Sequence, residues 1–170
     1  MGKRVAIMQP YFLPYVGYFH LINSADEFVI YDNIQYTKKG WINRNRILVN
    51  GNDKILTLPL KKDSDYLDVK DRFLADSWDI EKIKMLNQIK AAYRKAPYYD
   101  KVLPIISSIF ELPNTNLFEF ILGSLHLLNS YLRIDTKITT SSNVNIDHTL
   151  KGRDKVVAIC KKLNASTYIN

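Results

Sequence analysis

Residues 5–33 read VAIMQPYFLPYVGYFHLINSADEFVIYDN, and their pattern predicts the fold class. Short apolar runs at 4–9 and 27–31 end in turn-forming residues and predict two buried strands. Between them, apolar residues recur at helical spacing and predict a helix over 15–23. A strand, a helix and a strand within about thirty residues form a βαβ unit, so we expect a parallel sheet with a right-handed crossover.

The rest of the chain continues this alternation. Asn50-Gly51 predicts a hairpin between strands at 46–49 and 54–59, with Asn52 and Asp53 lengthening its turn. A further strand is expected at 66–73, and the helix expected over 116–132 is apolar on most sides and should be buried at the centre. The remaining expected elements are helices at 79–93, 98–112 and 152–163, and strands at 137–140 and 167–169.

These elements predict a three-layer, Rossmann-like α/β fold with a mostly parallel sheet that starts as βαβ, a central helical segment and a β-hairpin. No linker, repeat or low-complexity tract interrupts the 170 residues, so a single α/β domain over 1–170 is expected. The only cysteine is Cys160, and the apolar start lacks a cleavage site, so we predict a cytoplasmic protein without disulfides. No apolar run is long enough to span a membrane.

The net charge of +7 favours an anionic partner. Most lysines stand beside acidic residues and predict an ordinary solvated surface. The exception is YTKKGWINRNR, residues 36–46, where four cations and two aromatic rings occur without an acid, a composition suited to phosphate contact with stacking. If 43–46 is extended, both arginines share one face and suit bidentate capture of a diphosphate or carboxylate. The alternative is an edge strand whose charged side chains prevent pairing with a strand of another molecule.

Two other segments follow the expected parallel strands. The loop at 9–14 and Asp32 both come directly after a strand, and ligands of parallel sheets bind beyond those carboxyl ends. Asp32 is the expected base, and Gln9 is expected to orient the substrate with the loop amides. Gly17 permits close approach of backbone or ligand. His20 can reach a phosphate from the first helix, although an ordinary histidine is the favoured interpretation there, and the same holds for His126 and His148.

Three segments then carry a resemblance: MQPYFLPYVGYF at 8–19, VIYDNIQYTKKGWINRNRIL at 29–48 and LTLPL at 56–60. Together they resemble the WbqC-like protein family, bacterial proteins often found with genes for O-antigen and other surface polysaccharides. Asn33 stands where the family often has a second Asp, and a family region that follows the YI strand is expected to be missing here. The matching positions are Gln9, Pro10, Pro14, Gly17, Tyr18, Asp32, Gln35, Tyr36, Lys38, Trp41, Asn43, Arg44, Asn45 and Arg46.

The resemblance implies a transferase of surface-polysaccharide (O-antigen) precursor biosynthesis that acts on a nucleotide-linked amino sugar, with aminoacyl or acyl transfer as expected reactions. The layout is also similar to nucleotidylyltransferases, with Tyr15 and Tyr18 at the positions of two phosphate-binding histidines. The predicted catalytic residues are Asp32, Gln9 and Tyr18. The predicted ligand contacts are Pro10, Tyr11, Gly17, His20, Gln35, Tyr36, Lys38, Trp41, Asn43, Arg44, Asn45 and Arg46.

Other functions stay open at this point. A tRNA-binding module and a non-catalytic nucleotide-binding protein are the alternatives. The basic segment of this chain is short, which favours a small ligand over nucleic acid. We expect no DNA partner and no metal site. The sequence identifies no cofactor, and it leaves a homo-oligomer open.

Overall fold

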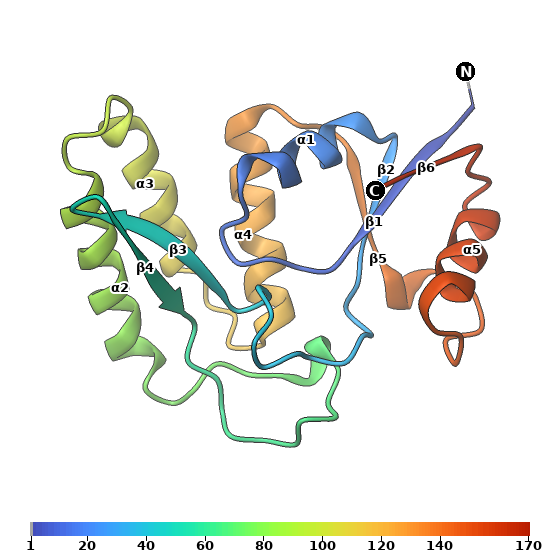
Figure 1. Cartoon of the computed structure of the whole chain (residues 1–170), viewed down its shortest axis with the longest axis horizontal. Coiled ribbons are helices and arrows are strands. Elements are labelled where there is room, and N and C mark those ends of the chain that lie inside the picture. The colour runs from blue at the N-terminus through green and yellow to red at the C-terminus, as the bar shows by residue number, and fades with distance from the viewer. Residues whose placement is uncertain (1) are drawn as a thin grey trace.

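The computed structural model describes residues 2–170, which form a four-stranded parallel sheet, a separate antiparallel hairpin and five α-helices (Figure 1). The predicted α/β class is therefore confirmed. Two short 3-10 turns cover Val69–Asp71 and Ser141–Asn143. In chain order, the elements are β1 (Arg4–Met8), α1 (Val16–Ser24), β2 (Glu27–Ile30), β3 (Arg44–Val49), β4 (Asn52–Thr57), α2 (Trp78–Tyr93), α3 (Tyr99–Phe110), α4 (Leu117–Leu132), β5 (Lys137–Thr140), α5 (Gly152–Lys162) and β6 (Thr167–Ile169).

The parallel sheet has the strand order β5-β2-β1-β6. In its register, Ala6 of β1 pairs with Phe28 of β2 on one side and with Ile169 of β6 on the other. The chain runs from β1 through α1 into the neighbouring strand β2. Strands β5 and β6 lie at opposite edges of the sheet, and α5 connects them. The carboxyl ends of β1, β2 and β5 therefore all meet at one edge of the sheet.

Successive side chains of a strand point to opposite faces of the sheet, and here both faces are covered by helices. Val5, Ile7 and Val29 pack with Ile159 of α5 on one face. Phe28 and the rest of the opposite face pack in the main core, together with residues of α1 and α4. Figure 1 shows α5 on one side of the sheet and α1 with α4 on the other, which is the expected three-layer arrangement.

The main core extends from α4 into the helical half of the molecule. Trp78 of α2 stacks on Phe110 of α3 with the ring centroids 5.9 Å apart, and it meets Phe120 of α4 edge-on at 5.3 Å. Phe12 from the first βα loop inserts between the same two phenylalanines, 6.3 Å from each ring. This loop is consequently fixed by a buried aromatic side chain, and α4 is the buried central helix that the sequence predicts.

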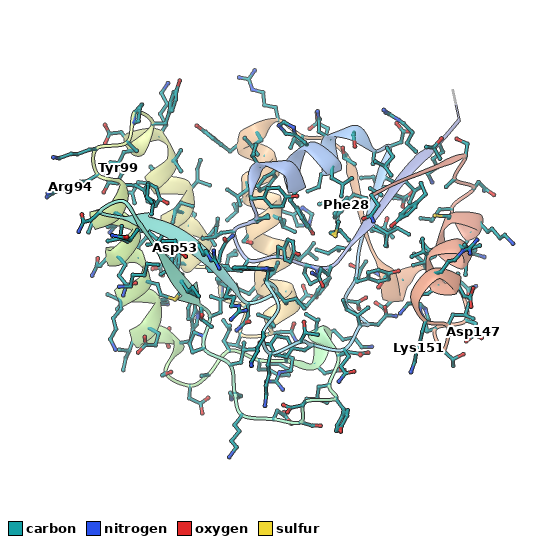
Figure 2. The ribbon with its side chains drawn as sticks, in the orientation of Figure 1. Phe28, Asp53, Arg94, Tyr99, Asp147 and Lys151 are labelled. Carbon is teal, nitrogen blue, oxygen red and sulfur yellow. The ribbon has the colours of Figure 1, made fainter. Side chains whose placement is uncertain are left out.

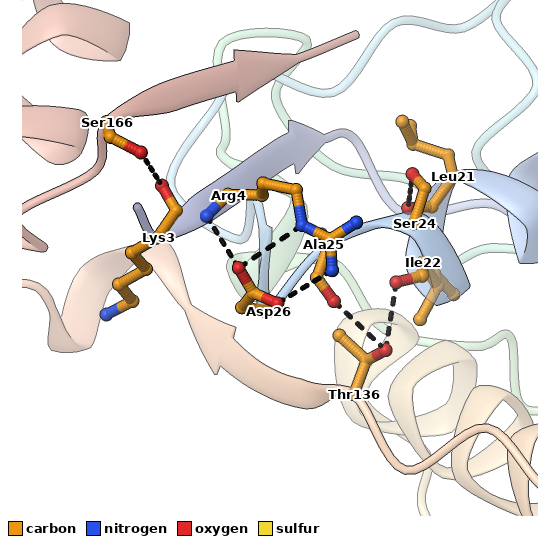
Figure 3. Close-up of polar contacts among 9 residues, drawn as sticks. All are labelled: Lys3, Arg4, Leu21, Ile22, Ser24, Ala25, Asp26, Thr136 and Ser166. Carbon is orange, nitrogen blue, oxygen red and sulfur yellow. Dashed lines mark hydrogen bonds and ion pairs between the residues drawn. The ribbon is translucent and has the colours of Figure 1, made fainter. Parts of the chain in front are cut away.

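Ion pairs close the amino edge of the sheet. Arg4 donates its backbone N–H and a guanidinium N–H to Asp26, at 2.7 and 2.8 Å (Figure 3). The carboxylate of Glu27 is 1% exposed and lies 2.7 Å from Lys3 and 2.9 Å from Lys137. Burial alone would raise the pKa of Glu27, but hydrogen bonds from Lys3, Thr139 and Lys137 outweigh it and hold the pKa at about 2.

Two local predictions are wrong. The hairpin turn contains only Asn50 and Gly51, at φ 49° and 81°, and Val49 pairs directly with Asn52. Two consecutive left-handed residues form the two-residue turn that matches strand twist, so Asn52 and Asp53 belong to β4 and do not lengthen the turn. Residues 66–73 contain a 3-10 turn and isolated bridges in place of a strand. The side chains of Val69 and Arg72 are both buried, three residues apart, which is the period of a 3-10 turn.

Within residues 2–170, none of the helices combines the length and the apolar character needed to cross a bilayer.

Candidate functional site

A polar pocket of about 690 Å³ opens at the carboxyl edge of the parallel sheet. Its floor consists of the ends of β1 and β2, including Gln9 and Tyr31, and its walls come from two later segments of the chain. One wall is the stretch at 33–35 with Tyr66 and Asp68, and the other is the entry into α5 from His148 to Val156. Figure 2 labels Lys151, one of these lining residues, beside the start of α5. We refer to this site as the polar pocket.

The most unusual group in the polar pocket is a buried lysine. Lys155 lies in the first turns of α5 and is only 6% exposed. Its Nζ donates to the backbone carbonyl and to the side-chain Oδ1 of Asn33, each at 2.9 Å, and lies 5.5 Å from the centre of the Tyr31 ring. It forms no salt bridge with any carboxylate of the described chain. A buried cation without a carboxylate partner is energetically costly and therefore marks a candidate site.

Asn33 connects this lysine to the rest of the sheet edge. Its Oδ1 accepts from the Ser141 hydroxyl at 2.6 Å as well as from Lys155. The same hydroxyl lies 2.8 Å from Oδ1 of Asp32, so its single proton is shared between the two acceptors. The Asn33 amide faces Nδ1 of His148 at 3.0 Å. Because that amide donates, a neutral His148 ring carries its proton on Nε2.

The charges around the polar pocket favour an anion. Burial lowers the pKa of Lys155, while the nearby carboxylates of Asp68 and Asp32 partly oppose this effect. Lys151 and His148 also line the pocket. Burial raises the pKa of Tyr31 to about 12, so its hydroxyl stays protonated at neutral pH. Among its charged lining residues, the pocket therefore has two lysines against one carboxylate, that of Asp68.

Asp32, the predicted base, is 3% exposed and does not line the polar pocket. Its Oδ1 accepts from the Ser141 hydroxyl and from the backbone N–H of Ser142 at 2.9 Å. Burial alone would raise the pKa of Asp32, but the hydrogen bonds from Ser142 and Ser141 outweigh it, so the pKa lies below its ordinary value. Asp32 is therefore connected to the pocket only indirectly, by the hydrogen bonds that link it to Ser141 and Ser141 to Asn33.

The other predicted catalytic residues occupy the first βα loop and α1. Gln9 lines the polar pocket, and its Nε2 donates to the Tyr11 hydroxyl at 2.9 Å. Tyr18 is 2% exposed, and its hydroxyl donates to the carbonyl of Gln9 at 3.0 Å. Burial raises the pKa of Tyr18. Tyr18 consequently fixes the loop that carries Gln9.

The predicted contacts around this loop lie in adjoining places. Pro10 is buried, whereas Tyr11, Gly17 and His20 line a smaller pocket on the α1 side of the loop. At Gly17, a Cβ would lie 2.3 Å from the ring of Tyr15, and because that ring is exposed it could move aside to accept a side chain.

The basic segment forms a second surface. Arg44 and Arg46 both lie over the exposed Trp41 ring, 5.3 and 5.1 Å from its centre, so the two arginines share one face as predicted. The two asparagines have a different position. Asn45 donates to the carbonyls of Phe12 and Leu13, and Asn43 donates to Leu58 at 2.9 Å, so these amides fasten the hairpin to its surroundings.

The remaining predicted contacts make mainly internal interactions. The Tyr36 hydroxyl donates to Asn43 at 2.8 Å, and both side chains are buried. Lys38 forms an exposed salt bridge with Asp65 at 2.7 Å. Gln35 donates to the Asp65 carbonyl at 3.0 Å, and it lines the polar pocket.

Sequence reasoning missed Lys151, Lys155 and His148. All three follow β5, and the segment after a parallel strand lies at the same carboxyl edge as the loop at 9–14. The expected strand at 137–140 and helix at 152–163 place 141–152, with His148 and Lys151, at this edge, whereas nothing in the sequence distinguishes Lys155. Within residues 2–170, no three His, Cys, Asp or Glu side chains are grouped as metal ligands.

Comparison with known proteins identifies the family. The model of the WbqC-like protein family matches residues 9–170. The chain is also 31% identical over 177 aligned positions to "Uncharacterized protein Rv1507c" of Mycobacterium tuberculosis, covering 99% of this chain and 72% of that protein. No solved structure gives a significant match. This chain belongs to the WbqC-like protein family.

Proposed function

We propose that this WbqC-like protein binds an anionic, nucleotide-linked amino sugar in the polar pocket and acts as a transferase of bacterial surface-polysaccharide precursor biosynthesis. The single observation that carries the proposal is Lys155, a buried cation without a carboxylate partner that lines a pocket at the carboxyl edge of a parallel sheet. A phosphate group of the ligand would supply the missing negative charge. The volume of about 690 Å³ lies in the range of small-molecule sites.

Each lining group has a distinct task in this proposal. Lys155 and Lys151 attract the phosphates, and His148 donates from Nε2 to a phosphate or sugar oxygen. Gln9 and Gln35 offer amide groups to sugar hydroxyls. Asp32 is a positioning residue that holds Ser141, and through it Asn33, in place. The family context of O-antigen genes supports the choice of a sugar nucleotide over other phosphate ligands.

A nucleic-acid ligand such as tRNA is the second candidate, and the pair of arginines over Trp41 favours it. Against it, the cations of this segment are confined to one short stretch, Lys38, Lys39, Arg44 and Arg46, which is a small number for a surface that follows a nucleic-acid backbone. A ligand that contacts many phosphates would show a much steeper loss of affinity with salt than a sugar nucleotide.

The experiment is a calorimetric titration with UDP-N-acetylglucosamine, UDP and a tRNA mixture at two salt concentrations. We expect the sugar nucleotide to bind with a shallow salt dependence. Lys151→Gln should weaken this binding about tenfold, since it removes a charge-assisted hydrogen bond. Lys161→Gln is the matched control, because Lys161 is an exposed lysine in the last turn of the same helix and outside the pocket. Tight, steeply salt-dependent tRNA binding without sugar-nucleotide binding would contradict the proposal.

A further inference from the structure

A second cavity, of about 390 Å³, lies in the helical half of the molecule, between the β3–β4 hairpin, the turn joining α2 to α3, and α1, α3 and α4. Figure 2 labels Tyr99, which lines this cavity, at the α2–α3 turn, at the opposite end of the molecule from Lys151. The cavity shares no lining residue with the polar pocket. We refer to it as the apolar cavity.

The walls of the apolar cavity are mainly aliphatic and aromatic, and Asn45, Arg46 and three tyrosines contribute the polar groups. The volume here is more than twice the roughly 150 Å³ of an engineered apolar cavity that stays dry and binds benzene. An apolar ligand would remove this surface from water, which is favourable in proportion to the apolar area buried. The aliphatic and phenylalanine side chains that line it are Leu13, Phe19, Ile47, Leu56, Ile89, Val102, Leu103, Ile106 and Leu128.

One charged side chain, Arg46, lines the apolar cavity. Its salt bridge with Asp53 is long, at 3.4 Å, and both side chains are more than half exposed, so the pair contributes little and can be exchanged for another anion. Asn45 also lines the cavity, but its amide is already bonded to Phe12 and Leu13. Arg46 is therefore the lining group that can bind a charged ligand. Because Arg46 is a cation, the charged group of that ligand should be an anion.

Arg46 also connects this cavity to the surface. Together with Asn45 and Pro14, it lines the neighbouring pocket that contains Tyr11, Tyr15 and Trp41. A ligand in the apolar cavity can consequently extend past Arg46 toward the Trp41 ring. The geometry is that of an apolar cavity with a cation on the side that it shares with this neighbouring pocket.

We propose that the apolar cavity binds the hydrocarbon tail of an acyl ligand and that Arg46 holds the anionic head of that ligand. The acyl group comes either from a free fatty acid or from an acyl thioester with a phosphorylated carrier. This inference goes beyond the sugar-nucleotide function, and because the two pockets share no residue, either proposal can fail while the other holds.

The test is a calorimetric titration of the full chain with octanoate, octylamine and octanoyl-coenzyme A. Octanoate should bind saturably, and octylamine, which has the same tail and the opposite charge, should bind at least tenfold more weakly. Tighter binding of octanoyl-coenzyme A assigns an acyl thioester, and equal or weaker binding assigns the free acid. Both results support an acyl site.

Two variants test the two ends of the ligand. Val102→Trp fills the cavity and should abolish octanoate binding, whereas Val157→Trp adds the same ring at an exposed position of α5 and should leave it unchanged. Arg46→Gln, at an exposed site where folding is not at risk, should weaken octanoate about tenfold. Arg153→Gln, on the surface of α5, is its control. The proposal is overturned if octanoate fails to bind, if octylamine binds equally well, or if neither Val102→Trp nor Arg46→Gln weakens binding.

Discussion

The amino and carboxyl edges of the parallel sheet each contain a buried charge, but only the charge at the amino edge has salt-bridge partners. At the amino edge, the buried carboxylate of Glu27 lies between Lys3 and Lys137. At the carboxyl edge, the buried ammonium of Lys155 donates hydrogen bonds only to neutral oxygens of Asn33 and forms no salt bridge within the described residues. Removing one partner from a buried ion pair is strongly destabilising, so the pair is part of the structure, whereas a charge without a counter-charge beside a pocket is available to a ligand. We therefore assign structure to the first edge and binding to the second.

The largest effect on stability should come from Asp32→Ala, which breaks the connection between β2 and the segment after β5. The variant loses the hydrogen bonds from Ser141 and Ser142, and hydrogen bonds to a buried charge predict a loss of about 2–4 kcal/mol in the free energy of unfolding. Urea denaturation measures this. Affinity for UDP-N-acetylglucosamine should fall as well, while octanoate affinity should stay unchanged.

The control for this variant is Asp147→Ala, which removes an exposed carboxylate that accepts from Thr149 in the loop leading to α5. It should change the free energy of unfolding by no more than about 0.5 kcal/mol, as is usual for surface substitutions. Equal destabilisation by the two substitutions would show that Asp32 has no special place at the carboxyl edge.

A smaller effect is expected from acid at the amino edge. Folding lowers the pKa of Glu27 from 4.5 to about 2, so between these values the unfolded chain binds more protons than the folded one. The contribution of Glu27 to stability is therefore complete above about pH 5 and is lost as the pH falls toward 2. Thermal unfolding measured across this range should show the decrease, and Glu27→Gln should make it shallower.

Asp26 provides the control, because its exposed pair with Arg4 also lowers its pKa to about 2, chiefly through the hydrogen bond from the Arg4 side chain. Asp26→Asn should leave the Glu27 part of the pH dependence in place. If Glu27→Gln and the unmodified protein lose stability with the same slope, the amino edge is not held by this carboxylate.

The sequence predicted most of the fold, and the reasons are local. The apolar runs of β1 and β2 and the spacing of α1 lie in one continuous stretch, and β5 and β6 were predicted at their observed bounds. The segment at 66–73 was predicted wrongly, because the apparent alternation of polar and apolar residues there comes from a 3-10 turn that buries Val69 and Arg72.

The candidate site was harder to predict, since it is assembled from distant segments. Asn33 and Lys155 are 122 positions apart, and composition gives no sign that they meet. Lys155 resembles every other lysine in the sequence until α5 places it against the Tyr31 ring. The motif predicts Tyr18 and Asn43 as site residues. In the structure, they donate to the Gln9 and Leu58 carbonyls, and these hydrogen bonds hold the loop and the hairpin in place.

Stability and affinity measured together in one variant, Lys155→Met, test whether this lysine binds a ligand. We expect the free energy of unfolding to change by no more than about 1 kcal/mol, because losing the bonds to Asn33 is offset by removing a buried unpaired charge. Affinity for UDP-N-acetylglucosamine should fall by more than tenfold. A variant that binds the sugar nucleotide as well as the unmodified protein, or that loses several kcal/mol of stability, would contradict the assignment of Lys155 to a ligand.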